Sequence, residues 1–106
     1  MNHTRIDLLQ KFISEDPSDP FNHYALALEY HQTNPAEASK LFDEIIINHP
    51  DYLPVYYTAG TFYAETANEE KALEIYKKGV ELARRKSDFK TLRELQSAIQ
   101  NLDAQM

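Results

Sequence analysis

Apolar side chains recur along this chain at intervals of three and four residues, the period that gathers them onto one face of a helix. In residues 35–48 these positions are Ala38, Leu41, Phe42, Ile45 and Ile46. In the last segment they are Phe89, Leu92, Leu95, Ile99 and Leu102. The chain of 106 residues has only 2 glycines, whereas hairpins and barrels use glycine at their turns. Pattern and composition together predict an all-α fold.

Helix-start signals divide the chain into predicted helices. Asp19-Pro20 and Asn34-Pro35 each place a capping residue before a proline at the first helical position, where a missing amide costs nothing. Glu37 follows Asn34 at the spacing of a capping box. Further start signals are Thr4 with Asp7, Asp51 ahead of Pro54, Asn68 ahead of Glu69-Glu70, and Ser87-Asp88. The predicted helices are 4–15, 20–33, 35–48, 52–66, 69–85 and 88–103, and their short connections favour antiparallel packing of neighbours.

The chain also contains an internal repeat. At a shift of 34 residues, Asn34, Ala38, Leu41 and Phe42 fall on Asn68, Ala72, Ile75 and Tyr76. At a shift of 33, Tyr24, Leu26, Ala27 and Tyr30 fall on Tyr57, Ala59, Gly60 and Tyr63. The difference is a single extra residue before Asn68. A repeated helical hairpin of this length predicts a stack of similar units.

This repeat resembles the tetratricopeptide repeat family, whose pattern runs aromatic, two residues, Leu-Gly, two residues, Tyr, then Ala, three residues, Phe, then Pro. The second unit supplies Tyr56, Ala59-Gly60, Tyr63, Ala72 and Tyr76 at matching spacings. The first supplies His23, Leu26-Ala27, Tyr30, Ala38, Phe42 and Pro50. The chain departs from the pattern at His23, at the bulky Ile45 and at Arg84, which replaces the repeat-ending proline and suggests a longer fifth helix. The resemblance covers about residues 19–84.

The resemblance implies a single domain over residues 1–106, a short right-handed solenoid of stacked antiparallel hairpins. Its parts would be an N-terminal helix 4–15, repeat 1 at 19–50, repeat 2 at 51–85 and a capping helix 88–103. Small residues would allow the helices of each hairpin to approach closely, namely Ala27, Ala38, Gly60 and Ala72. The N-terminal helix would cover one end with Ile6, Leu9, Phe12 and Ile13, and Gln96 would face water at the other.

Charge and composition narrow the classes of partner. A net charge of −6 repels phosphate backbones, so we expect no nucleic-acid partner. No run approaches the roughly 20 apolar residues of a membrane span, so we expect no membrane partner. The first residues lack the pattern of a secretory signal, which predicts a cytoplasmic location. The absence of cysteine excludes disulfides and thiol chemistry.

Nothing in the sequence suggests catalysis, a metal or a cofactor. None of His3, His23, His31 and His49 has another His or a Glu at the three- or four-residue spacing of a helical zinc site. The sequence has no nucleophile motif and no glycine-rich phosphate loop. We therefore predict a binding protein rather than an enzyme.

In the family that this chain resembles, the first helices of successive units line a concave groove for a peptide or a partner helix. The matching positions are Phe21, Tyr24, Leu28 and His31 in the first unit, Pro54, Tyr57, Thr61 and Ala64 in the second, and Arg93 with Ser97 in the last helix. This aromatic and apolar set favours a partner with apolar anchors. The net charge favours neutral or basic segments, whose binding salt would weaken. Alternatively, Tyr24 and Tyr57 are packing residues without a ligand.

Two function classes remain open. One is an adaptor that binds a protein or peptide partner in the groove. The other is a self-associating module, such as a homodimer, whose groove is filled by its own helix or by one from a second copy. Three repeats are the usual minimum for a stable solenoid, which favours such self-association. The subclass that clamps a terminal carboxylate with Lys, Arg and Asn is not expected, because the matching positions hold Tyr24, Leu28, Tyr57 and Thr61.

Overall fold

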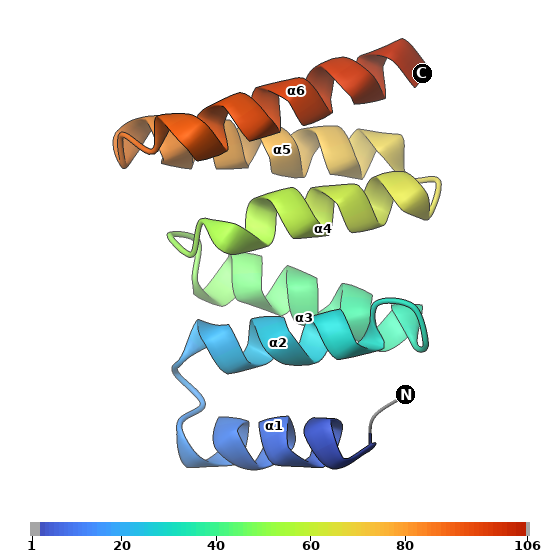
Figure 1. Ribbon diagram of the computed structural model, residues 1–106, viewed down its shortest axis with the longest axis vertical. Coiled ribbons are helices and arrows are strands. Elements are labelled where there is room, and N and C mark those ends of the chain that lie inside the picture. Colours follow the sequence, from blue (N-terminus) through green and yellow to red (C-terminus); the bar gives the residue numbers. More distant parts are fainter. Residues whose placement is uncertain (1–2, 106) are drawn as a thin grey trace. The chain divides into compact units, whose positions relative to one another are not determined.

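The computed structural model describes residues 3–105, and that part of the chain consists of six α-helices joined by short turns (Figure 1). They are α1 His3–Glu15, α2 Pro20–Tyr30, α3 Pro35–Asn48, α4 Pro54–Glu65, α5 Glu69–Arg85 and α6 Phe89–Gln105. No residue from 3 to 105 lies in a strand, which confirms the predicted all-α class. The helices form two compact units, the first ending at Tyr52 and the second beginning at Leu53.

Side-chain caps begin most of these helices where the sequence predicts them. In each case a carboxylate or amide oxygen accepts a backbone N–H from the first helical turn. The residues that do so are Asp19, Asn34, Asn68 and Asp88. Asp88 accepts both the backbone N–H of Thr91 at 3.1 Å and its hydroxyl at 2.9 Å. These two bonds stabilise the ionised carboxylate and so lower the pKa of Asp88.

Other predicted boundaries are wrong, for local reasons. The N-cap of α4 is Leu53, which has no side-chain cap bond, so Asp51 is not a cap. Thr4 lies inside α1, which already includes His3. The second helix ends at Tyr30 rather than 33, and its C-cap His31 donates its backbone N–H to the Leu28 carbonyl, three residues back instead of four. In the turn that follows, the backbone N–H of Asn34 donates to the Tyr30 carbonyl at 2.8 Å. In a reciprocal capping box the backbone N–H of Asn34 would instead donate to the side chain of Glu37.

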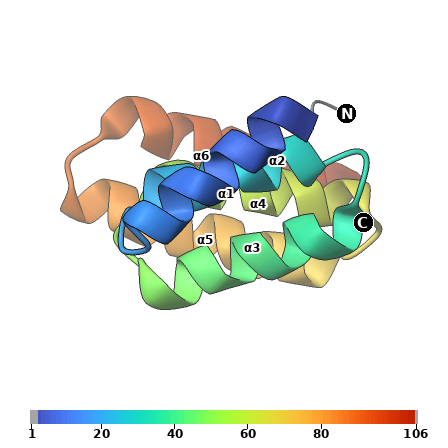
Figure 2. The same ribbon diagram turned by 90° about the horizontal axis from the view of Figure 1, so that it is seen from below.

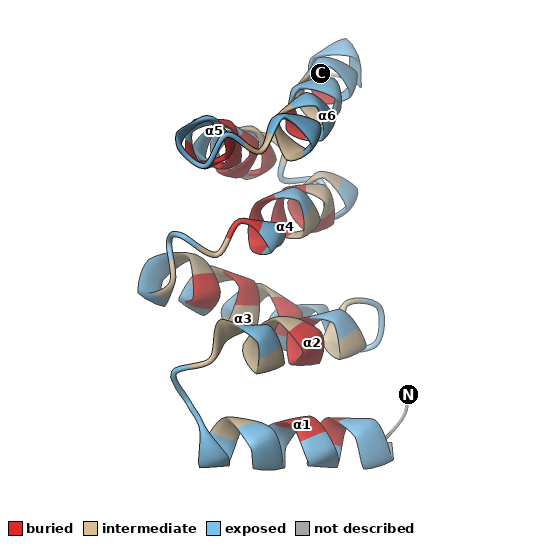
Figure 3. Cartoon of the chain, turned by 60° about the vertical axis from the view of Figure 1, so that its left-hand side comes forward, coloured by how far each residue is buried: buried red, intermediate tan, exposed pale blue. Residues whose placement is uncertain are grey.

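In the first unit, α2 and α3 form an antiparallel hairpin and α1 packs on α2. Ile6 and Leu9 of α1 join Ala25 and Leu26 of α2 in a buried cluster (Figure 3). An ion pair between Arg5 Nε and Glu29 Oε1, at 2.9 Å, links the same two helices.

The prediction that Phe12 shares the buried face of α1 is wrong. Its side chain is 39% exposed, whereas Ile13 packs against the buried cluster. Neighbouring residues of a helix point about 100° apart, so a face centred on Ile6, Leu9 and Ile13 leaves Phe12 at its margin.

In the second unit, α5 packs against both α4 and α6, and Figure 2 shows it on one side of that pair. Two glycines allow this close approach. A Cβ added at Gly60 would overlap the ring of Tyr76, which confirms the need for a small residue there. A Cβ at Gly79 would lie 2.7 Å from Tyr56 Cβ in α4 and 3.0 Å from Leu95 Cδ1 in α6.

Two residues with left-handed backbone conformation terminate α4 and α5. They are Ala67, with φ of 60°, and Ser87, with φ of 56°. Each turn is closed by the next residue's backbone N–H, which bonds a carbonyl five residues earlier. As the missing proline at Arg84 suggests, α5 continues to Arg85.

Candidate protein-binding groove

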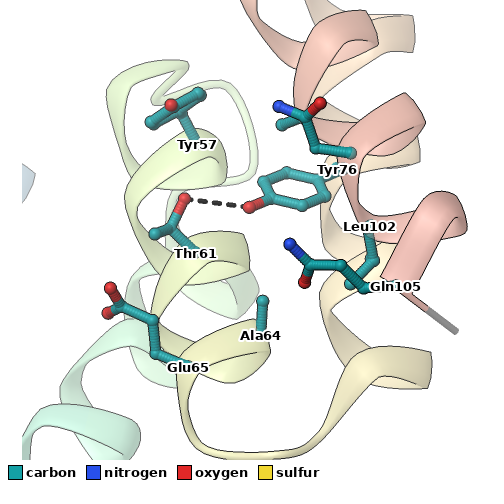
Figure 4. Close-up of a pocket in the computed structure, with 9 residues that line it drawn as sticks. Tyr57, Thr61, Ala64, Glu65, Tyr76, Leu102 and Gln105 are labelled. Carbon is teal, nitrogen blue, oxygen red and sulfur yellow. Dashed lines mark hydrogen bonds between the residues drawn. The ribbon is translucent and has the colours of Figure 1, made fainter.

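A groove lies between α4 and α6 in the second unit, with Tyr76 of α5 among its lining residues (Figure 4). In the described part of this unit it comprises clefts of about 320, 340 and 300 Å³, each lined by Tyr57. The lining residues of the first cleft are Tyr57, Thr61, Ala64, Glu65, Tyr76, Ala98, Asn101, Leu102 and Gln105. We call these joined clefts the α4–α6 groove.

The α4 wall consists of residues that share one helical face. Pro54, Tyr57, Thr61 and Ala64 follow at intervals of three, four and three residues, and all four line the groove. Tyr57 is 45% exposed, and its ring centroid lies 6.3 Å from that of Tyr76 in a tilted arrangement. The wall therefore presents a large aromatic surface that the fold leaves open to solvent.

A hydrogen bond joins α4 to α5 inside the groove. The hydroxyl oxygens of Thr61 and Tyr76 lie 2.9 Å apart (Figure 4). Burial raises the pKa of the Tyr76 phenol, the hydrogen bond with Thr61 opposes that rise, and the nearby Tyr57 and Glu65 add to it. Tyr76 therefore stays protonated at neutral pH and contributes a neutral hydroxyl to the groove.

The α6 wall is mostly polar, whereas the sequence predicts an aromatic and apolar groove. Its polar side chains are Lys90, Arg93, Glu94, Ser97, Asn101 and Gln105, and Ala98 and Leu102 are its apolar ones. Arg93 and Ser97, the two positions that the sequence analysis names on the last helix, line this wall, and their role in binding stays a prediction. Sequence reasoning missed Asn101 and Gln105, although steps of four residues from Ser97 lead to both. It also missed Tyr76, because the repeat motif assigns that aromatic to packing alone.

The predicted positions of the first unit lie on α2, except His31, which is the C-cap of that helix. Phe21 and Leu28 are 58% and 42% exposed, and Tyr24 and His31 are partly buried. The ring of Tyr24 meets that of Tyr52 edge-on, with centroids 5.7 Å apart. Burial of the phenol is the main cause that raises the pKa of Tyr52, and the nearby Tyr24 and Asp19 raise it further. Tyr24 thus has a packing role, and a role in ligand contact stays a prediction.

The described residues offer little to metal chemistry. Among residues 3–105, no three His, Cys, Asp or Glu side chains gather closely enough to hold a metal ion. The Nε2 atom of His23 instead lies 2.9 Å from the Pro17 carbonyl, across the turn that precedes α2. Within the same residues, no helix is both long and apolar enough to span a bilayer.

The repeated helical hairpins define the chain as a helical-repeat protein, and comparison with solved structures agrees with this fold. A solution structure of a tetratricopeptide repeat domain protein from Salinibacter ruber is 38% identical over 84% of this chain and 91% of that one, with a TM-score of 0.79. A crystal structure of such a protein from the same organism is 37% identical over 81% and 97%, with a TM-score of 0.75.

MamA shares the fold alone, at 17% identity over 94% of this chain and 67% of that one, with a TM-score of 0.65. No family profile matches the chain, and no curated protein matches it. On the similarity to the Salinibacter ruber domain, the chain belongs to the tetratricopeptide repeat family.

Proposed function

We propose that this protein is a non-enzymatic interaction module whose α4–α6 groove binds a segment of a partner protein. Tetratricopeptide repeats are helical scaffolds that generally serve protein–protein interaction, and membership of the family supports this role. The observation that carries the proposal is Tyr57, an aromatic residue 45% exposed at the junction of the clefts.

The unlike walls of the groove favour an amphipathic segment. Pro54, Tyr57 and Ala64 on α4 suit an apolar anchor, because a tyrosine ring offers a large contact area at little cost in entropy. The α6 wall supplies amide, hydroxyl and charged groups that suit the polar side of the same segment. Lys90 and Arg93 sit beside Glu94, so this wall has charges of both signs.

The direct test is the loss of binding on removal of the Tyr57 ring. A peptide selected from a random library for binding to the wild-type chain serves as the probe, and its affinity is measured by isothermal titration calorimetry. We expect Tyr57→Ala to weaken binding at least about tenfold, as for a central aromatic anchor in an interface. Because Tyr57 is half exposed, the fold should tolerate the change, which circular dichroism verifies.

Phe89→Ala is the matched control. Phe89 is an aromatic residue of α6, 57% exposed, and it lines none of the clefts described above. Its removal should leave the affinity unchanged. Equal affinities for wild type and Tyr57→Ala would contradict the proposal.

A further inference from the structure

Helix α1 in the first unit carries a second exposed apolar feature, apart from the α4–α6 groove. Leu8 and Phe12 are 47% and 39% exposed and lie four residues apart, so they share a helical face. Arg5 and Glu15 extend this face by three residues in either direction. We call Arg5, Leu8, Phe12 and Glu15 the α1 stripe, and its 3-4-3 spacing is that of a coiled-coil seam.

We propose that the α1 stripe docks on the α1 stripe of a second copy of this chain, with the two helices antiparallel about a two-fold axis. In that pairing Leu8 faces the partner's Phe12, and Arg5 faces the partner's Glu15. The two-fold axis repeats each contact, so the interface is self-complementary and closes as a dimer.

The charges at the ends of the stripe select both the occupant and its direction. In an antiparallel pair each Arg5 meets a carboxylate, whereas a parallel pair would set Arg5 against Arg5 and Glu15 against Glu15. Like charges across a helix pair destabilise it, and opposite charges fix its orientation. A second copy therefore carries the required complementary pattern.

The existing ion pair of Arg5 is compatible with this contact. Its Nε atom lies 2.9 Å from Glu29 Oε1, which holds the side chain at the surface, and the side chain is 55% exposed. A guanidinium group has five N–H donors, so Arg5 can serve a second carboxylate as well. Glu15 lies exposed at the end of α1.

Sedimentation velocity over a wide range of protein concentration tests the dimer. Because the stripe holds two large apolar side chains per copy, we expect weak association that becomes visible as the concentration rises. Leu8→Glu and Phe12→Glu should each keep the chain monomeric, and Glu15→Arg should weaken the dimer at least about tenfold through repulsion from the partner's Arg5. Circular dichroism checks that α1 remains folded in each variant.

The matched control is Ile47→Glu on α3, where the side chain is 76% exposed. This variant should associate like the wild type. A wild-type chain that stays monomeric at the highest concentration would overturn the proposal, as would a dimer unaffected by Leu8→Glu and Phe12→Glu.

Cysteine substitutions test the register, because the natural chain has no cysteine. Leu8→Cys mixed with Phe12→Cys should form a disulfide-linked dimer faster than either variant alone, since these positions face each other across the pair. If Leu8→Cys cross-links to itself as fast as to Phe12→Cys, the antiparallel register is wrong.

Discussion

At the scale of single residues, the closest helix contacts of the second unit depend on two glycines, which have no side chain. Gly60 and Gly79 lie where α5 meets its neighbours, and in both places a Cβ would collide with a packed side chain. Ala67 and Ser87 show the opposite situation, because each has a Cβ at a backbone conformation that favours glycine. Glycine should therefore give a more stable chain than a residue with a Cβ at both kinds of position, although only the first kind now has it.

Gly79→Ala should destabilise the chain by about 1–3 kcal/mol, the usual cost of overpacking a core. The new Cβ would lie 2.7 Å from Tyr56 Cβ, an atom close to the main chain that cannot move aside easily. This cost exceeds the gain in helix propensity of about 1 kcal/mol. Urea denaturation measures the difference, and a variant as stable as wild type would contradict the close contact of α4 with α5.

Ala67→Gly should stabilise the chain by about 1 kcal/mol, because glycine relieves the left-handed conformation that follows α4. Thermal and urea unfolding would report the change. Ala36→Gly is the control, since Ala36 lies exposed in the first turn of α3, and there glycine should be neutral or destabilising. A loss of stability in Ala67→Gly would mean that this turn is formed differently.

At the scale of helices, the sequence was sufficient for their number, type and approximate position, because caps and the 3.6-residue period are local properties. The errors occur where a boundary depends on the backbone of a turn. Leu53, not Asp51, is the N-cap of α4, after a turn in which the Tyr52 N–H donates to the His49 carbonyl. Asn101 and Gln105 were missed as groove residues for a related reason, because the path of α6 beside α4 is a tertiary property.

The cap of α6 makes a prediction about pH. Its bonds from Thr91 lower the pKa of Asp88 in the folded chain, so they stabilise the fold above the carboxyl's ordinary pKa and are lost as the pH falls through the lowered value. Asp88→Asn should thus cost more stability at neutral pH than at a pH of about 3. Asp51→Asn is the control, because Asp51 caps no helix. A difference between wild type and Asp88→Asn that does not change with pH would contradict this role.

At the scale of the molecule, the internal repeat made the family predictable, because its small and aromatic positions recur with near-constant spacing. The polar character of the α6 wall was not predictable in the same way. Helix α6 departs from the repeat motif, for example at Gln96 in a small-residue position, so the motif says little about which of its side chains face α4. The polar side chains of the groove thus come mainly from helix α6, whose sequence departs from the motif.

Amide chemical-shift mapping with the library-selected peptide shows directly whether the peptide binds in the proposed α4–α6 groove. The largest shifts on titration should belong to Tyr57, Thr61, Arg93, Ser97 and Asn101, with little change on the outward face of α5. Shifts concentrated on α1 or α3, with the α4–α6 groove unaffected, would contradict this proposal.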